Sequence, residues 1–233
     1  MCAVVQNTKF KETHDYESEI ESTLLDELFS PVNSDDNSTY LFLKRVIDLI
    51  GSTVLILVAA PIMFVILIVV RASSNGPAIF AQRRLTKGGR IFYMYKFRTM
   101  RVGAEEDTGP TWATLSDPRV TKIGKFLRRS RLDELPQLFN VLRGEMSLVG
   151  PRPERPEIAA RITLELPEFS NRLAVPAGIT GLAQVSDGYA VSLHSYKRKL
   201  IHDVAYIKHR SLWLDLKILA RTLPVILTGS GSR

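Results

Sequence analysis

The feature that most constrains this chain is an uncharged apolar run of 22 residues, LIGSTVLILVAAPIMFVILIVV, between Asp48 and Arg71. A continuous helix of that length spans about 33 Å, which is enough to cross the hydrocarbon core of a bilayer. The run starts too far along the chain for an ordinary signal peptide and lacks the small-residue cleavage pattern. We therefore expect it to remain in the mature protein and to attach it to a membrane.

Two topologies are open for this run. Pro61 lies near its middle and frees the backbone carbonyl of Leu57, so a break or kink is expected there. Basic residues stand on both sides of the run, namely Lys44, Arg45, Arg71, Arg83, Arg84, Lys87 and Arg90. Because lysine and arginine favour the cytosolic side, both ends are drawn to one face of the membrane. A re-entrant helical hairpin satisfies this pattern, and a kinked spanning helix is the alternative.

Charge divides the chain unevenly. Residues 1–39 hold two lysines and nine acids, so the remaining 194 residues carry +14 although the whole chain carries +7. We expect an acidic, disordered tail over 1–39, a re-entrant hairpin over 40–72 and a cytosolic-face domain over 73–233. A basic body suits nucleic acid, anionic lipid or phosphorylated substrates, and charge alone does not choose among them. The single cysteine, Cys2, excludes an internal disulfide.

A β-hairpin is predicted after the apolar run, with two strands around Gly88-Gly89. Side chains alternate along a strand, so Lys96 and Arg98 are expected to point the same way. Taken alone, two such cations indicate either a solvated sheet face or a contact with phosphate.

Helices are predicted for most of the rest. Residues 122–129 form a basic helix with an apolar face of Ile123, Phe126 and Leu127. The next helix has an apolar stripe of Leu135, Leu138, Phe139 and Leu142. Residues 193–227 suggest two more helices, and the leucine stripe of the second fits either a protein core or a membrane interface. The predicted fold class is α+β, mainly helical, with a small hairpin and interfacial amphipathic helices.

Two adjacent carboxylates, Asp133 and Glu134, fall in the first turn of the second predicted helix. Free amide donors and the positive end of the helix dipole should lower the pKa of both, so both should be charged at neutral pH. Adjacent helical residues diverge by about 100°, so these are not the facing carboxylates of a glycosidase, but both can reach one metal ion. Ordinary capping is the alternative.

Cations surround this carboxylate pair in the sequence. Arg128, Arg129 and Arg131 lie upstream, and the segment Pro151-Arg152-Pro153 presents Arg152 with little conformational freedom. Opposite charges gathered around rigid turns suit a complex of a metal ion with a diphosphate.

These motifs together resemble one family. KRVIDLIGS, FAQRR, YKFRTM, LDELPQLFNVLRGEMSLVGPRPE, PAGITGLAQV and HDVAYIKHRSLWLDLKIL follow one another over residues 44–219. They are similar to the bacterial sugar transferases, also called small monotopic phosphoglycosyl transferases, which begin the assembly of exopolysaccharide, capsule and other glycans. The resemblance implies location at the cytoplasmic face of the inner membrane.

The resemblance also implies a reaction. A phosphosugar moves from a UDP-sugar to polyprenyl phosphate, usually undecaprenyl phosphate, giving polyprenyl diphosphate sugar and UMP with Mg²⁺ as cofactor. Asp133 would be the nucleophile that forms an aspartyl phosphosugar, and Glu134 the magnesium ligand beside it, with Asp133 close to the same ion. An anionic nucleophile that attacks a diphosphate needs such neutralisation.

Further residues follow by the same resemblance. Arg128 and Arg152 would bind phosphate, with Asp203 and Tyr206 as additional members of the site. Lys44 and Arg45 would lie at the membrane surface near the lipid phosphate. The resemblance favours the re-entrant hairpin with Pro61 at its bend, although the family often has serine where this chain has Ala60.

Two other functions are considered. One is an inactive membrane scaffold for glycan assembly, and the other is a membrane-anchored protein that binds nucleic acid. The retained carboxylates and the Pro-Arg-Pro segment disfavour both, so we expect no nucleic-acid partner. The sequence does not identify the sugar, the polyprenyl chain or the glycan pathway, and it leaves the oligomeric state open, with a homodimer among the options.

Overall fold

The structure is a computed structural model, and it describes residues 37–104, 117–186 and 193–228. The predicted acidic tail lies almost wholly outside these residues. The helices are α2 Ser38–Ser73, α3 Lys122–Arg129, α4 Gln137–Leu142, α5 Pro156–Glu165, α6 Leu182–Ser186, α7 Leu193–His209 and α8 Leu212–Thr228. The short 3-10 turns are η1 Lys87–Gly89, η2 Leu132–Glu134 and η3 Pro167–Ala174. The strands are β1 Ile79–Leu85, β2 Ile91–Phe97, β3 Ser147–Val149 and β4 Gly178–Thr180.

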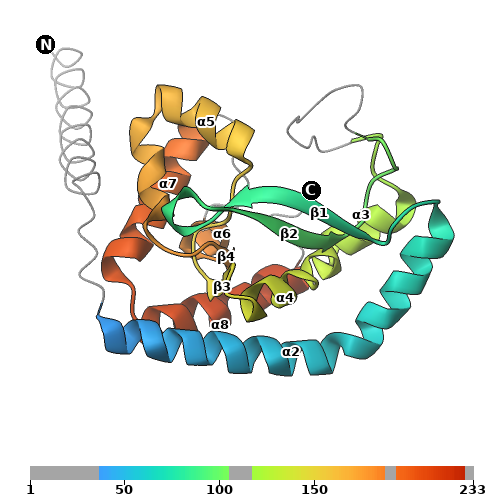
Figure 1. The fold of residues 1–233 in the computed structure, drawn as a ribbon, viewed down its shortest axis with the longest axis horizontal. Helices are drawn as coiled ribbons and strands as arrows, with labels where there is room; N and C mark the ends of the chain where they lie inside the picture. Colours follow the sequence, from blue (N-terminus) through green and yellow to red (C-terminus); the bar gives the residue numbers. More distant parts are fainter. Residues whose placement is uncertain (1–36, 105–116, 187–192, 229–233) are drawn as a thin grey trace, which may run out of the picture.

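The predicted class of a mainly helical fold with a small sheet is confirmed. Figure 1 shows α2 along the base of the molecule, with α8 beside it and α5 on the opposite side. The hairpin of β1 and β2 lies between these two levels. The candidate site is therefore built above α2, where short elements from the middle of the chain meet.

Helix α2 is one continuous helix that bends in its second half (Figure 1), and Pro61 lies inside it. The break or kink expected near Pro61 is therefore a bend within one continuous helix. One stripe of α2 faces the body of the protein, at the three- and four-residue spacing of a helix face. Its members are Asp48, Ser52, Ile56, Met63, Ile66 and Val70.

The other faces of α2 are apolar and exposed. The most apolar window of the helix has a mean hydropathy of 3.1, and only 11% of it is buried. Among the described residues α2 is the one helix long and apolar enough to cross a membrane. Exposed apolar area on this scale marks a surface that meets a partner or lipid rather than water.

The predicted hairpin is confirmed. Strands β1 and β2 are antiparallel, and the turn contains Gly88 and Gly89 with φ of 68° and 74°, values that suit glycine. Lys96 and Arg98, however, reach different partners. The Arg98 guanidinium donates to the carbonyl of Ser74 at 2.8 Å and so caps the end of α2. Arg98 is therefore buried and does not share the Glu134 contact of Lys96.

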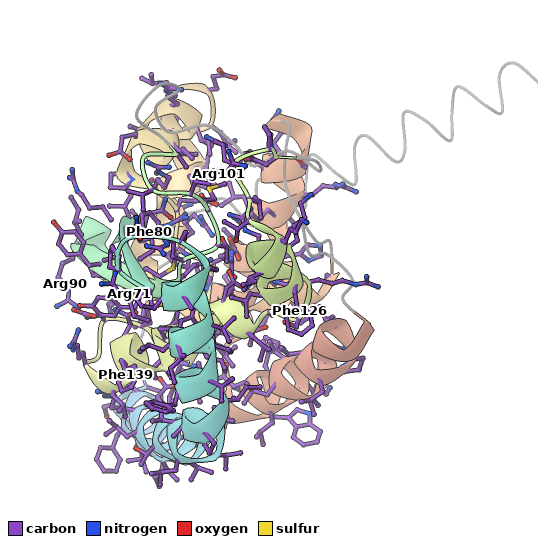
Figure 2. The ribbon with its side chains drawn as sticks, turned by 90° about the vertical axis from the view of Figure 1, so that its right-hand side faces the viewer. Arg71, Phe80, Arg90, Arg101, Phe126 and Phe139 are labelled. Carbon is purple, nitrogen blue, oxygen red and sulfur yellow. The ribbon has the colours of Figure 1, made fainter. Side chains whose placement is uncertain are left out.

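Aromatic residues on α3 and α4 differ from the prediction. Leu127 of α3 is buried as expected, but Phe126 is 65% exposed and Phe139 of α4 is 41% exposed. Figure 2 shows these two rings on either side of the second half of α2, while Arg101 lies far from the lower length of the helix. The apolar surface of α2 thus continues onto its neighbours.

Helix α8 adds to the same surface. Trp213, Leu216 and Leu223 are more than half exposed, whereas Ile218 is buried on the opposite side. Of the two alternatives for the leucine stripe, this arrangement favours an interface with a membrane over a core.

Strands β3 and β4 form a short parallel pair that places the Pro-Arg-Pro segment. Directly after β3, Gly150 lies so close to Gly178 that a side chain on Gly178 would approach the backbone nitrogen of Gly150 to 2.1 Å. Glycine is required for this close approach. Strand β3 was not predicted, because three residues carry no periodic signal.

Candidate active site

Asp133 and Glu134 lie on η2, a separate 3-10 turn rather than the first turn of α4. Arg131 enters this turn with a φ of 55°, which is unusual for a residue with a side chain. Pro136 then precedes α4, where its missing amide donor does no harm. The two carboxylates are therefore held by a tight turn between α3 and α4.

Glu134 is fixed by two cations from distant parts of the chain. Arg152 donates to both of its oxygens, at 2.6 Å and 3.2 Å, and Lys96 donates to Oε1 at 3.1 Å. Two parallel bonds from one guanidinium give a strong and directional contact. The structure thus brings together Asp133, Glu134, Lys96 and Arg152.

The pKa of Asp133 differs from expectation. Its side chain is buried, at 7% exposed, and burial raises the pKa to about 6. The charge of Glu134 raises it further, while Lys96, Arg128 and Arg152 offset part of the change. The predicted lowering is wrong for Asp133, because loss of hydration outweighs the local dipole.

Glu134 follows the predicted direction. Burial opposes its ionisation, but Arg152 and Lys96 together outweigh that effect and hold its pKa well below the usual value. The pair therefore contains one firmly ionised carboxylate and one that keeps a proton more readily.

Arg128 lies at the edge of this cluster. Its Nε donates to the hydroxyl of Thr99 at 2.9 Å, and its charge favours ionisation of Asp133. Together with Lys96 and Arg152 it makes the surroundings of the carboxylates basic. A basic surrounding of this kind suits a phosphorylated ligand.

A second group of charges supports Arg152 from behind. Arg172 is almost fully buried and donates to the backbone carbonyl of Arg152 at 2.7 Å. It also donates twice to Oδ2 of Asp203, at 2.7 Å and 3.1 Å. Asp203 is therefore connected to the site through Arg172, which the sequence reasoning missed because no motif surrounds it.

Glu154 completes this group. It accepts from Lys199 at 2.5 Å and lies 3.7 Å from Arg84 and 3.9 Å from Arg172. Burial alone would raise the pKa of Glu154, but these three cations lower it to about 2. Glu154 and Lys199 were also missed by the sequence reasoning.

Lys44 and Arg45 lie elsewhere and hold α2 to the body, and Tyr206 of α7 shares a partner with Lys44. Lys44 pairs with Asp215 of α8 at 2.8 Å, and Tyr206 donates to the same carboxylate at 2.8 Å. Arg45 donates to the last carbonyls of α4, those of Val141 and Leu142. The structure therefore places these residues at contacts between helices, away from the carboxylate pair.

The donor set at η2 fits one kind of metal site. The described residues contain no cluster of three or more histidine, cysteine, aspartate or glutamate side chains. Magnesium, however, is commonly held by one or two carboxylates together with substrate phosphates and water. Asp133 and Glu134 fit such a shared site, and they do not fit a cage made by protein alone.

Comparison with known proteins identifies the family. The family described as bacterial sugar transferase matches residues 39–229. The chain belongs to this family. The match runs from α2 through α8, and so it includes the carboxylate pair and the apolar helix.

Three relatives illustrate the similarity. A UDP-N-acetylgalactosamine-undecaprenyl-phosphate N-acetylgalactosaminephosphotransferase of Aeromonas hydrophila is 43% identical, over 83% of this chain and 46% of its own length. A UDP-glucose:undecaprenyl-phosphate glucose-1-phosphate transferase of Xanthomonas campestris pv. campestris is 42% identical, over 83% and 40%. A protein of the same name from Caulobacter vibrioides is 40% identical, over 79% and 70%. The chain thus spans less than half the length of the first two.

Proposed function

We propose that this protein transfers a phosphosugar from a UDP-sugar to undecaprenyl phosphate or a similar polyprenyl phosphate. The observation that carries the proposal is the buried Asp133 beside Glu134, which Arg152 and Lys96 fix in place. The names of the relatives, which specify UDP-sugars and undecaprenyl phosphate, support the same reaction. The products are polyprenyl diphosphate sugar and UMP.

In the first proposed step the Asp133 carboxylate attacks the phosphorus that bears the sugar. A bond forms between a carboxylate oxygen and that phosphorus, the bond to the bridging oxygen breaks, and UMP leaves with the electron pair. Burial removes water from the carboxylate and so makes it a better nucleophile. Lys96, Arg128 and Arg152 neutralise the charge on the phosphates.

In the second proposed step a phosphate oxygen of the lipid attacks the same phosphorus. The bond to Asp133 breaks, and the carboxylate is restored. Two displacements let a water-soluble donor and a membrane-bound acceptor use one site in turn. The kinetics should therefore be ping-pong.

Magnesium, which the family resemblance implies, would be held by Glu134 and Asp133 together with the substrate phosphates. When bound, it would supply further neutralisation of the diphosphate and of the departing UMP. The ion pairs of Glu134 with Arg152 and Lys96 position that carboxylate for this role.

We further propose that α2 enters the membrane and returns to the cytoplasmic face. Near its start Lys44 binds Asp215, and near its end Val70 and Ser74 accept from Arg98. Both ends of α2 are thus bound to the same body of the protein. If the helix spanned the bilayer, its two ends would lie on opposite sides and could not both keep these contacts. A buried stripe on one side and exposed apolar residues on the other suit a helix embedded in one leaflet.

The test of the reaction uses purified protein in detergent with a UDP-sugar, polyprenyl phosphate and Mg²⁺. We expect release of UMP that depends on the lipid, and near-complete loss of release for Asp133→Asn. The matched control, Glu165→Gln, makes the same change from carboxylate to amide at an exposed position on α5 and should leave the rate unchanged. Release of UDP instead of UMP would contradict the proposal, because it indicates direct transfer of the sugar.

Trapping tests the covalent step separately. With donor labelled in the sugar and no lipid present, the wild-type protein should retain one label per chain after denaturation. Asp133→Asn should retain none. A second reaction contains the lipid and is quenched rapidly during turnover. If UMP is released but no labelled protein is found, the transfer occurs in one displacement.

A further inference from the structure

A cavity of about 450 Å³ lies directly behind the Pro-Arg-Pro segment, between η1, α5 and η3. We infer that it binds the uridine portion of the donor, an inference that rests on the proposed function. Its volume falls within the range of about 300–1,000 Å³ that is typical of small-molecule sites.

The cavity adjoins the carboxylate cluster through one residue. Arg152 lines the cavity, and its guanidinium binds Glu134. A nucleotide whose diphosphate lies against Arg152 would therefore have its phosphates near Asp133 and its nucleoside on the cavity side. Lys96, the other cation that binds Glu134, does not line the cavity.

The lining favours a flat base over a sugar. Most of the wall is aliphatic, including Pro153, Ala159, Ala160 and Leu173. A pyranose has hydroxyl groups around its ring and would leave them without partners against such a wall, which is unfavourable. A pyrimidine base has two apolar faces and needs polar contacts only at its edge, where Ser170 and Thr163 also line the cavity.

The charged residues of the wall are already neutralised. Glu154 and Arg172 line the cavity but are held by Lys199 and Asp203, respectively. Fixed ion pairs and three prolines, Pro151, Pro153 and Pro156, make the wall rigid before any ligand binds. A preformed wall lowers the entropic cost of binding.

The position of the cavity disfavours the lipid as its occupant. It is lined by α5, which lies on the side of the molecule opposite to α2 (Figure 1). The exposed apolar residues that would meet a membrane are on α2 and its neighbours. A polyprenyl chain therefore has an apolar environment at the base of the molecule, whereas the cavity faces the water-soluble substrate.

The test fills the cavity with a larger side chain. Ala160 lines the cavity and is exposed on α5, so Ala160→Leu should reduce the available volume without loss of folding. Ala220→Leu on α8 makes the same change at an exposed position away from the cavity. Binding of UMP is measured by calorimetry, and KM for the UDP-sugar and for polyprenyl phosphate is measured by turnover.

We expect Ala160→Leu to weaken UMP binding and to raise KM for the UDP-sugar by the same factor, about tenfold or more. The KM for polyprenyl phosphate should stay unchanged, and Ala220→Leu should behave as wild type. A higher KM for the UDP-sugar with unchanged UMP affinity would overturn the inference in favour of a sugar pocket. A higher KM for the lipid alone would overturn it in favour of the acceptor.

The inference and the proposed function fail in different ways. Unchanged UMP affinity in Ala160→Leu, with normal release of UMP by the wild type, would reject the uridine pocket and keep the reaction. Weakened UMP binding in Ala160→Leu, with no turnover by the wild type under any donor, would keep the nucleotide pocket and reject the reaction.

Discussion

At the scale of single residues, burial of the Asp133 carboxylate favours its proposed reactivity and lowers the stability of the folded protein. A carboxylate prefers water, and the fold removes nearly all of it. Neighbouring cations compensate only in part, since the pKa of Asp133 stays raised to about 6. The folded protein therefore binds a proton at Asp133 more tightly than the unfolded chain does.

This raised pKa predicts that Asp133→Asn stabilises the metal-free protein. The contribution of Asp133 is fully favourable below about pH 4 and is lost as the pH rises through 6, since the folded pKa exceeds the usual 3.8. The difference between a pKa of about 6 and the usual 3.8 corresponds to a free energy of about 3 kcal/mol at most. In chelator at about pH 7.5, the variant should be more stable than wild type by up to that amount, as measured by denaturant unfolding.

The same variant should lose this advantage at acidic pH, where Asp133 of the wild type is protonated. Glu165→Gln, at an exposed position, serves as the control and should change the free energy of unfolding by less than about 0.5 kcal/mol. A destabilised Asp133→Asn protein at about pH 7.5 would contradict the assignment, because it would mean that the anion is favourably held.

Glu154 makes the opposite prediction. Its pKa is lowered to about 2, so its stabilising contribution is present above about pH 4.5 and is lost as the pH falls toward 2. Glu154→Gln leaves Lys199, Arg172 and Arg84 near one another without their shared anion. We expect a loss of about 3–5 kcal/mol in thermal or denaturant unfolding at neutral pH.

The control for this change is Glu157→Gln, which alters a partly exposed carboxylate 3.9 Å from Arg155. Exposed pairs contribute about 0–1 kcal/mol, so little change is expected. Equal stability of the two variants would show that the buried charges around Glu154 are neutralised in another way.

The residues of the site were predictable to different degrees. Asp133, Glu134 and Arg152 stand in one continuous motif whose rigid turns are visible in the sequence. Arg172 has no such neighbourhood, because its role depends on the fold bringing η3 to the Pro-Arg-Pro segment. The contact of Arg98 with Ser74 was not predictable for a similar reason, since strand alternation gives no information on the helix end that Arg98 caps.

At the scale of elements, α2 is the feature on which the proposed membrane attachment depends. The helix has 36 residues and would be about 54 Å long if straight, which exceeds the thickness of a bilayer core. It nevertheless keeps contacts with the body along its whole length, from Lys44 to Val70. These contacts are the basis for the proposal that α2 is re-entrant.

This arrangement predicts that both ends of α2 lie on one side. Ser38 and Asn75 are exposed at the two ends, and Ser38→Cys and Asn75→Cys can be made in a Cys2→Ser background. In spheroplasts, an impermeant maleimide should label neither position until the inner membrane is opened, and then label both. Labelling of one position alone in intact spheroplasts would demonstrate a spanning helix.

The long elements were predicted from sequence better than the short ones. The apolar run and the Gly88-Gly89 hairpin carry strong local patterns, and both appear in the structure. The sequence did not predict the parallel pair of β3 and β4, because each has three residues and they pair across about 30 intervening positions. The sequence predicts Asp133 in the first turn of α4, whereas the structure places it on a separate 3-10 turn, since Pro136 is compatible with either boundary.

At the scale of the whole molecule, α2 supplies polar partners to three other elements. Asp48 accepts from the backbone amide of Leu148 at 2.9 Å, in a buried contact with β3. Arg45 caps α4, and Lys44 neutralises the buried Asp215. Removing α2 would take Asp48 from the buried amide of Leu148 and Lys44 from Asp215, which would keep Tyr206 as a partner. A buried polar group left unpaired costs about 1–3 kcal/mol.

We therefore predict that a fragment of residues 73–233 does not fold cooperatively. The sequence-based division at residue 72 stays a prediction, and this fragment tests it. Circular dichroism in the near ultraviolet and the slope of denaturant unfolding should both indicate loss of fixed packing, even in detergent. A fragment with a sharp, cooperative transition would show that residues 73–233 form an independent unit.

The contact between Asp48 and Leu148 has a consequence for biosynthesis. Its two residues are 100 positions apart, so the ribosome has released the whole of α2 long before β3 exists. Under the proposed membrane attachment, α2 would enter the bilayer first, and the later strands would then assemble against it. Assembly of this protein would accordingly start at α2, and the carboxylate pair would be completed after it.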